Sequence, residues 1–376
     1  MAEVSRRSVL RSLLACSALH PLARLEQPSS PSRTFEPHSD KWRNFEVITT
    51  VRLRDASGDA TVWVPIPAIN GPWQRSLSSE MTGNTARMAI ETDLKSGARF
   101  VVARFTGDAL AAPTLEVISR VQTRDRSVDW GAHDRAGGND LEAPAQLKRW
   151  TEPTTFIPTN GIVRKTAARI TAGAGTELEK ARRIYDWIII NTYREPKARG
   201  CGLGDIKSLL EMGDLGGKCA DLNGLFVGLC RAVGIPARDL YGLRLTPSAF
   251  GYKELGSNPA SLKAAQHCRA EVHLNGYGWV AMDPADVAKV MRQETGEWIK
   301  DAAHPLVVPV RKGLFGGWEG NWMAYNSAAD VTLPGATGRP LPFLMYPQAQ
   351  SGESRYDPYN ADGFTYTIVA HEIAAA

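Results

Sequence analysis

The sequence predicts an α+β protein in which a strand-rich N-terminal region precedes helices packed on an antiparallel sheet. Three observations predict this class. Short segments that alternate apolar and polar residues fill positions 43–125, striped helical patterns occupy 162–233, and two strand-like segments separated by Asn275-Gly276 follow. At 376 residues the chain is long enough for two domains and a sizeable buried core.

The N-terminal region contains five segments with period-two alternation and many β-branched residues. They are residues 45–53, 60–65, 87–91, 99–105 and 115–121. Gaps rich in turn-forming residues separate them, as is typical of antiparallel strands. We therefore expect a small β-sandwich over residues 43–125. No cluster of reactive side chains occurs in this region.

Three helical patterns lie in a second unit, which we place at residues 145–300. They cover residues 162–170, 177–193 and 219–233. The second pattern carries an apolar stripe and begins at a predicted capping box formed by Thr176 and Glu179. The remaining residues, 301–376, are rich in proline and glycine, and we expect them to pack on this unit as an irregular segment.

The N-terminus is predicted to be an export signal. Arg6-Arg7 precede a short apolar run that includes Leu13-Leu14-Ala15, a pattern that resembles the bacterial twin-arginine signal for folded proteins. We assign residues 1–23 to the signal peptide and 24–42, rich in proline and serine, to a linker. The sequence therefore predicts a periplasmic protein.

Two other interpretations of the leader remain open. Leu13-Leu14-Ala15-Cys16 also resembles a lipoprotein acylation box, which would make Cys16 a lipid anchor. The leader can also be a disordered basic segment with no targeting role. No later segment reaches the roughly 18 apolar residues that a membrane span requires, so we expect no span and a soluble mature protein.

Charge and cysteine usage exclude several classes of function. The formal net charge is +4, but no run of lysine or arginine is long enough for a nucleic-acid interface, so we expect no nucleic-acid partner. The five cysteines are Cys16, Cys201, Cys219, Cys230 and Cys268. They are too few for a disulfide scaffold, and no C-x-x-C zinc signature occurs, so we expect neither metal nor cofactor.

Cys219 is the first candidate functional residue. Gly216-Gly217 permit a tight turn, after which the pattern becomes helical, so Cys219 lies at or near a helix N-terminus. Unpaired backbone N–H groups and the helix dipole favour a thiolate there, and the same N–H groups can stabilise an oxyanion. Cys230 lies on the same helical face among apolar residues, and we assign it to packing, the usual role of a cysteine in an apolar helix.

His267 is the second candidate. In a strand that begins at His267, one face carries His267, Arg269, Glu271 and His273. The other face carries Cys268 and small or apolar residues. The histidine therefore faces a polar side, whereas Cys268 points toward the core.

Asp283 is the third candidate, at the end of the strand-like segment that returns from Asn275-Gly276. A two-residue turn would pair Leu274 with Tyr277 and place Asp283 on the face opposite His267. A three-residue loop would pair Leu274 with Gly278 and place Asp283 on the same face as His267, diagonally across. We predict the second register, because bringing the two side chains together requires that register or an equivalent bulge.

Three motifs, in order, resemble the transglutaminase-like family. They are the glycine-led Cys219 helix that runs into Arg231-Ala232-Val233-Gly234-Ile235-Pro236, the His-x-x-x-Glu-Val segment from His267, and Gly-Trp-Val-x-x-Asp-Pro ending at Pro284. The resemblance covers roughly residues 160–290. It departs from the family after the histidine, where members often have an aromatic, as in His-Ala-Trp, whereas this chain has His267-Cys268-Arg269.

The resemblance implies a papain-like core in which Cys219 is the nucleophile, His267 its base and Asp283 the group that orients the imidazole. It implies acyl transfer at an amide bond through a Cys219 thioester. We expect hydrolysis of a peptide or protein substrate rather than cross-linking, because water is always present. Asn191 and Tyr193 are candidates for a second oxyanion donor.

Four alternatives stay open at this point. Gly-Gly-x-Cys followed by an acidic residue and Asn223 also resembles arylamine N-acetyltransferases, which use the same triad. A catalytically idle envelope binding module is a second. A metal site built from Cys201, Cys219, His267 and Cys268 is a third, disfavoured by strand parity. A disulfide between Cys201 and Cys268 is the last.

Overall fold

The computed structural model describes residues 33–54, 56, 58–85, 87–131, 142–360 and 362–374. The predicted signal peptide, Cys16 and residues 24–32 of the predicted linker lie outside the described residues. From Arg33 onward the chain forms one compact unit. In its described part, no helix has the length and apolarity needed to cross a membrane.

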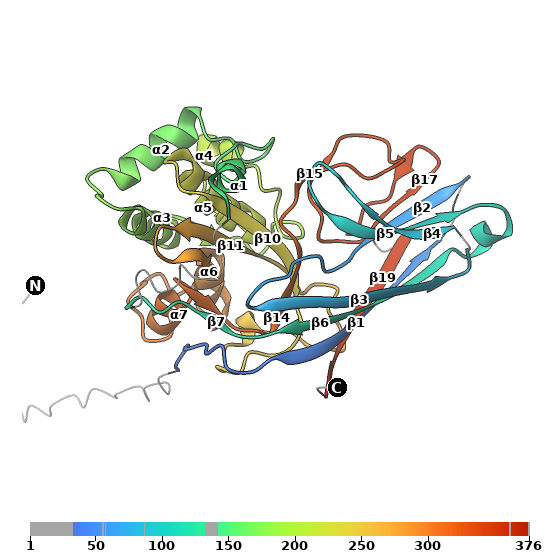
Figure 1. Ribbon diagram of the computed structural model, residues 1–376, viewed down its shortest axis with the longest axis horizontal. Coiled ribbons are helices and arrows are strands. Elements are labelled where there is room, and N and C mark those ends of the chain that lie inside the picture. Colours follow the sequence, from blue (N-terminus) through green and yellow to red (C-terminus); the bar gives the residue numbers. More distant parts are fainter. Residues whose placement is uncertain are drawn as a thin grey trace, which may run out of the picture. The chain divides into compact units, whose positions relative to one another are not determined.

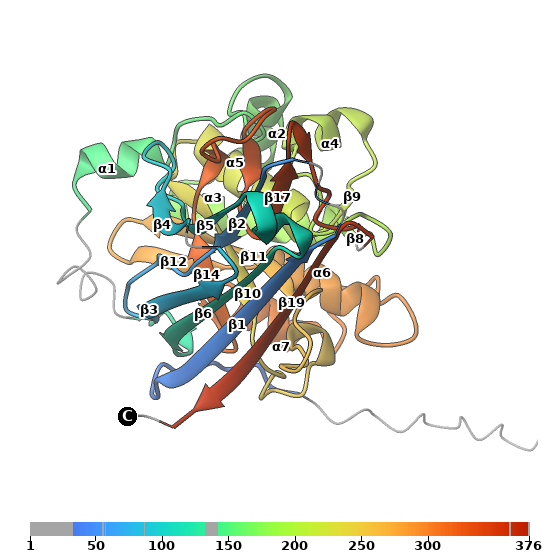
Figure 2. The ribbon, with the colours of Figure 1, turned by 90° about the vertical axis from the view of Figure 1, so that its right-hand side faces the viewer.

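Two antiparallel sheets form the N-terminal sandwich (Figure 1). The first has the order β19 (Phe364–Ile373), β1 (Arg43–Leu53), β6 (Thr114–Thr123) and β3 (Gln74–Gly83), and lies in front in Figure 2. The second has the order β18 (Ser354–Arg355), β17 (Gln348–Ser351), β2 (Ala60–Pro65), β5 (Arg99–Phe105) and β4 (Met88–Thr92). Buried side chains from both sheets, such as Val47 and Val62, belong to one core, which confirms the predicted sandwich.

The C-terminal segment differs from the expectation that it packs on the second unit. Strand β14 (Trp322–Asn326) does join that unit, but β17 pairs with β2 and β19 pairs with β1 along ten residue pairs. The alternation of β19 is visible in its sequence, yet its partner lies more than 300 residues away, so local pattern could not assign it. Strand β3 was also missed, because its side chains are mostly exposed and polar.

A four-stranded antiparallel sheet organises the second unit, with the order β12 (Gly278–Met282), β11 (Gln266–Leu274), β10 (Ala237–Arg244) and β14. Helix α5 (Cys219–Ala232) packs against β10 and β11. Helices α2 (Gly161–Thr171), α3 (Glu177–Asn191) and α6 (Pro284–Gln293) pack on α5. The three predicted helices are present, and the predicted capping box of α3 is confirmed.

The shorter elements connect these layers. They are α1 (Pro144–Arg149), α4 (Ile206–Met212), α7 (Val308–Gly313), η1 (Gly107–Ala111), η3 (Lys253–Leu255), β7 (Arg126–Ser127), β8 (Tyr193–Arg194), β9 (Gly216–Gly217), β13 (Gly317–Trp318), β15 (Ala329–Val331) and β16 (Leu341–Phe343). Helices α4 and α6 were not anticipated from the sequence.

Helix α5 is buried along almost its whole length and lies at the centre of the second unit. Gly228 makes this possible on one side, since a Cβ there would come within 2.2 Å of the Ile206 side chain and 3.1 Å of Ile157. A side chain at this position would push α4 away from α5. The close packing fixes the helix, and with it the position of Cys219 at its N-terminus.

The hairpin between β11 and β12 has the register that the sequence predicted. Leu274 pairs with Gly278, and the Tyr277 N–H donates to the Leu274 carbonyl at 3.0 Å. Gly276 and Gly278 have φ of +79° and +68°, a conformation that glycine adopts without strain. Because Ala270 pairs with Met282, the next residue, Asp283, lies on the face of His267.

Candidate active site

Cys219 is the first residue of α5, and its side chain is 1% exposed. Asp221 holds the turn before it, accepting the N–H of Lys218 at 2.9 Å and those of Leu203 and Gly204 at 3.0 and 2.9 Å. The approach requires glycine, since a Cβ on Gly202 would lie 1.8 Å from the Asp221 carboxylate. One carboxylate therefore fastens the loop after Cys201 to the start of the helix.

His267 and Asp283 meet between β11 and the start of α6. The Nε2 atom of His267 lies 2.7 Å from Oδ2 of Asp283, and the two residues are 4% and 0% exposed. Asp283 is also the N-cap of α6, because its Oδ1 accepts the N–H of Asp286 at 3.1 Å. Pro284, whose fixed φ suits the first helical position, follows directly. The Asp-Pro pair therefore starts the helix and positions the carboxylate.

A second carboxylate, which the sequence analysis missed, also contacts the imidazole. Oδ1 of Asp286 lies 3.3 Å from Nε2 of His267. Arg244, at the end of β10, donates from one nitrogen to both Asp286 oxygens, at 2.7 Å to Oδ2. The position of Asp286, three residues after an N-cap aspartate, is a sequence signal that could have identified it. No local sequence pattern indicates Arg244, because it lies on a different strand.

Asn223, one turn into α5, ties the three segments together. Its amide donates to Asp283 Oδ1 at 3.0 Å and to the Cys268 carbonyl at 2.9 Å. Its oxygen accepts the N–H of Ala285 at 3.1 Å. Because Asn223 is buried and uses both ends of its amide, it fixes the helix that carries Cys219 relative to Asp283.

The pKa values of Cys219 and His267 move in opposite directions. Burial and Arg244 lower the pKa of His267, but Asp286 and Asp283 outweigh them and raise it to about 9. Burial alone would raise the pKa of Cys219, but hydrogen bonds from Cys201, Cys268 and His267 bring it well below the ordinary value. The favoured state of the pair is thus a thiolate beside an imidazolium.

The nitrogen of His267 that faces Cys219 follows from its other contacts. Nε2 is directed to the two carboxylates, which leaves Nδ1 as the nitrogen available to Cys219. The Trp322 indole donates to the His267 carbonyl at 3.0 Å, which holds the backbone in place. Three residues predicted from the sequence, Cys219, His267 and Asp283, are therefore brought together.

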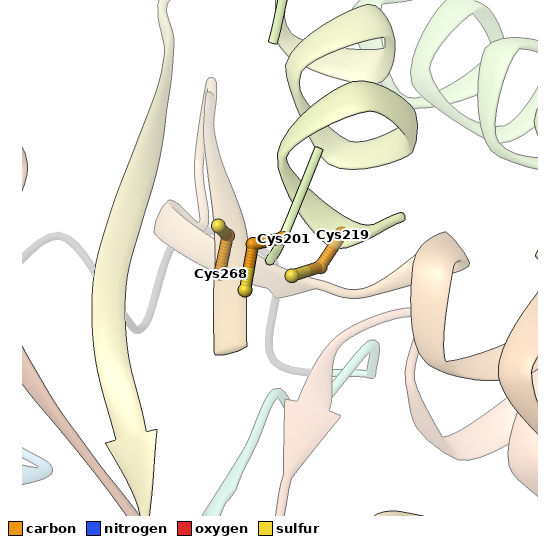
Figure 3. A group of neighbouring side chains, drawn as sticks. All are labelled: Cys201, Cys219 and Cys268. Carbon is orange, nitrogen blue, oxygen red and sulfur yellow. The ribbon is translucent and has the colours of Figure 1, made fainter. Parts of the chain in front are cut away.

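Two further thiols lie next to Cys219. The sulfurs of Cys201, Cys219 and Cys268 are all within 4.8 Å of one another (Figure 3). All four described cysteines are free, so the Cys201–Cys268 disulfide that the sequence left open is not formed. Cys268 points to the core as predicted, but the core at that point contains the start of α5.

A cavity of about 210 Å³ opens beside His267. Three cationic side chains line it, those of Arg194, Arg244 and Lys289, and no acidic residue does so among its described lining residues. Gln266 also lines it and is 7% exposed. The side-chain nitrogen of Gln266 is buried without a hydrogen-bond partner in the described part of the chain.

The two oxyanion candidates from the sequence are engaged elsewhere. The Asn191 amide donates to the Trp187 carbonyl at 2.9 Å, and the Tyr193 hydroxyl donates to Asp214 at 2.8 Å. At the helix start, the Ala220 N–H donates to the Cys201 carbonyl at 2.9 Å. The N–H of Cys219 itself has no hydrogen-bond partner among the described residues.

A cysteine at a helix N-terminus that faces a histidine and a carboxylate from the adjacent sheet defines the papain-like class of thiol sites. A family model described as the transglutaminase-like superfamily matches residues 164–284, a range that contains all three residues. An uncharacterized protein of Haemophilus influenzae is 31% identical over 377 residues, covering 97% of this chain and 100% of its own length. This chain belongs to the transglutaminase-like superfamily.

Two solved structures are similar at low sequence identity. A proposed cysteine protease from Cytophaga hutchinsonii is 16% identical, with a TM-score of 0.49, covering 88% of this chain and 99% of that chain. The periplasmic domain of TgpA from Pseudomonas aeruginosa is 15% identical, with a TM-score of 0.35, covering 71% of this chain and 98% of that domain.

Proposed function

We propose that this protein is a thiol enzyme that cleaves an amide bond in a peptide or protein substrate through a Cys219 thioester. The observation that carries the proposal is a histidine whose Nε2 meets two carboxylates and whose charge lowers the pKa of Cys219 well below its ordinary value. In such a pair the thiolate is the nucleophile and the imidazolium is the proton donor.

The reaction proceeds in two halves. The Cys219 thiolate adds to the amide carbonyl carbon, and the carbonyl electron pair moves to oxygen. When the carbon–nitrogen bond breaks, His267 gives its proton to the leaving amine, and a thioester remains. His267, now neutral, takes a proton from water as the water attacks the thioester, which releases a carboxylic acid and restores the thiolate. Asp283 and Asp286 stabilise the imidazolium in both halves.

Two donors are candidates to stabilise the negative oxygen. One is the Cys219 N–H, at the positive end of the α5 dipole. The other is the side-chain amide of Gln266, which lines the cavity beside His267 and whose nitrogen has no partner within the described structure. We assign both to the oxyanion site.

The cavity supports hydrolysis over cross-linking to lysine. Cross-linking requires a lysine side chain to approach the thioester, and that amine is protonated in solution near neutral pH. Arg194, Arg244 and Lys289 line the cavity, although Arg244 is paired with Asp286 and Lys289 with Glu254. A cationic lining disfavours the approach of a protonated lysine on the His267 side of the site, whereas water carries no charge to be repelled.

Thiol alkylation tests the proposal without knowledge of the substrate. Iodoacetamide should alkylate Cys219 rapidly at neutral pH, and Cys219→Ala should abolish the fast phase. His267→Ala should slow it by about tenfold or more, because the thiolate loses its counter-charge. Cys230→Ala is the matched control and should leave the rate unchanged.

A slow reaction in the wild-type protein, unaffected by His267→Ala, would contradict an enzymatic role and favour an idle binding module. If the fast phase is present, a peptide library should yield acyl-enzyme adducts on Cys219 detectable by mass spectrometry. Adducts that react with added amines much faster than with water would overturn hydrolysis in favour of transamidation.

We also propose that the activity operates outside the cytoplasm. The support is the Arg6-Arg7 pair and the apolar run after it. Replacing both arginines by lysine should retain the protein in the cytoplasm of a bacterial host. Periplasmic recovery equal to that of the unmodified chain would contradict this proposal.

A further inference from the structure

The three-thiol cluster is more than the nucleophile needs. Cys201 comes from the loop before α4, Cys219 from the start of α5, and Cys268 from β11. Their sulfurs lie within 4.8 Å of one another, all three residues are buried, and none is bonded to another cysteine. The catalytic scheme uses only Cys219, so two thiols placed against it have no role in that scheme.

We propose that Cys201, Cys219 and Cys268 form a binding site for a thiophilic metal ion, Zn²⁺, and that metal binding inhibits the enzyme. Three sulfurs around one point are the donor set that zinc accepts in three-cysteine sites, with a fourth position for water or another residue. Hard cations such as Mg²⁺ and Ca²⁺ take oxygen ligands and are not expected here.

The spacing of the sulfurs suits such an ion. Zinc–sulfur bonds of about 2.3 Å in a tetrahedral site place the sulfurs about 3.8 Å apart. The three sulfurs, all within 4.8 Å, therefore need to close by at most about 1 Å, which side-chain rotation can supply. Figure 3 shows the three side chains next to one another.

The scaffold holds the three residues in place. The Ala220 N–H donates to the Cys201 carbonyl, and Asp221 binds the N–H groups of Leu203 and Gly204, so the Cys201 loop is anchored to α5. The Asn223 amide donates to the Cys268 carbonyl, which anchors β11 to the same helix. A site with preset ligands loses little conformational entropy on binding metal.

Inhibition rests on the proposed function, because it requires Cys219 to be the nucleophile. A metal bound to the Cys219 sulfur removes the electron pair that attacks the carbonyl. The effect is reversible, since a chelator restores the free thiolate. The ion need not bind His267, whose Nε2 is already held by Asp283 and Asp286.

Metal titration of the reduced full-length chain tests the site. Cd²⁺, a spectroscopic substitute for Zn²⁺, should bind with one ion per chain and give sulfur-to-metal charge-transfer absorption, and Zn²⁺ should displace it. Cys201→Ala and Cys268→Ala should each weaken binding by about tenfold or more, since each removes one ligand. Cys230→Ala, a buried thiol on the same helix outside the cluster, is the matched control and should bind as wild type does.

The outcomes separate this inference from the proposed function. Tight binding that Cys201→Ala and Cys268→Ala leave unchanged, but His267→Ala abolishes, would overturn the cluster in favour of a simple Cys219–His267 chelate. Fast alkylation without tight Cd²⁺ binding would overturn the metal site and leave the enzyme intact. Tight Cd²⁺ binding with slow alkylation would support the site and contradict the thiol enzyme. Thermal unfolding of each variant shows that lost binding is not lost folding.

Discussion

Helix α5 carries two buried cysteines with opposite chemistry. Cys219, at the N-terminus, is 1% exposed and has a pKa well below the ordinary value, whereas Cys230, near the C-terminus, is 0% exposed and has a raised pKa. Burial acts on both in the same direction, because it disfavours the charged form. What separates them is the set of partners: hydrogen bonds from His267 and two thiols for Cys219, and little beyond Arg231 for Cys230.

The comparison shows that burial does not by itself make a thiol inert. A buried thiol becomes a nucleophile when the protein supplies a counter-charge that exceeds the desolvation cost. That counter-charge depends in turn on Asp283 and Asp286, which keep His267 protonated. The ionisation of Cys219 therefore depends on His267, and that of His267 on the two carboxylates. Each of these interactions can be removed by a single substitution.

The largest expected effect is that of Cys219→Ala. Amide hydrolysis should fall by about 10⁴-fold or more, as in triad enzymes that lose the nucleophile. Turnover of a peptide substrate before and after substitution measures it. Activity within tenfold of wild type would show that another group performs the chemistry.

Asp283→Asn tests the interaction between the Asp283 carboxylate and the His267 imidazolium. The asparagine can still occupy the space but cannot stabilise the imidazolium, so kcat should fall by about 10²- to 10⁴-fold. Its matched control is Asp186→Asn, which alters a partly buried carboxylate that pairs with Arg311 and does not touch His267. If both substitutions reduce kcat equally, the contact between the Asp283 carboxylate and the imidazole does not contribute specifically to catalysis.

Gln266→Ala tests the oxyanion donor. Loss of one such donor should reduce kcat by about 10²-fold with little change in KM. Alkylation by iodoacetamide forms no oxyanion and should stay as fast as in wild type. A parallel loss of alkylation would instead indicate that Gln266 maintains the structure around Cys219.

The pH profile tests the protonation of His267. Hydrolysis needs the imidazolium to release the amine, so kcat/KM should fall about tenfold per pH unit above about 9, where His267 loses its proton. Alkylation needs only the thiolate and should not fall there. Asp286→Asn removes one carboxylate that raises this pKa and should move the alkaline limb to lower pH. An unchanged alkaline limb would show that Asp286 does not raise the pKa of His267.

Cys230→Ala has the smallest expected effect and completes the comparison. Activity and alkylation should be unchanged, while the free energy of unfolding should fall by about 1–2 kcal/mol, because a small cavity forms in a packed helix. Denaturant unfolding measures the change. A loss of activity at unchanged stability would show that the two cysteines are not chemically separate.

The proximity of Cys219, His267 and Asp283 could be predicted, because each residue lies in a short local sequence pattern. The glycine turn placed Cys219 at a helix start, and the alternation of β11 placed His267 on a polar face. The register of the hairpin then followed from one geometric requirement, which the Leu274–Gly278 pairing confirmed. Local pattern and strand parity were sufficient for these positions.

Other parts could not be predicted, because they depend on contacts between distant segments. Arg244 meets Asp286 only after β10 pairs with β11, and Cys201 reaches Cys219 through a loop without periodicity. Strand β19 pairs with β1 from the opposite end of the chain. In each case the partner is specified by packing, which a single sequence does not display.

Titration of the Cys219 thiolate tests the Cys219–His267 ion pair on which the proposed function depends. The ultraviolet absorbance of thiolate, measured against pH as the difference between wild type and Cys219→Ala, isolates this one group. The account predicts that the absorbance is already present at neutral pH and is lost only in acid, well below the usual thiol pKa of about 8.5. A difference signal that appears only near that usual value would contradict the ion pair and the function built on it.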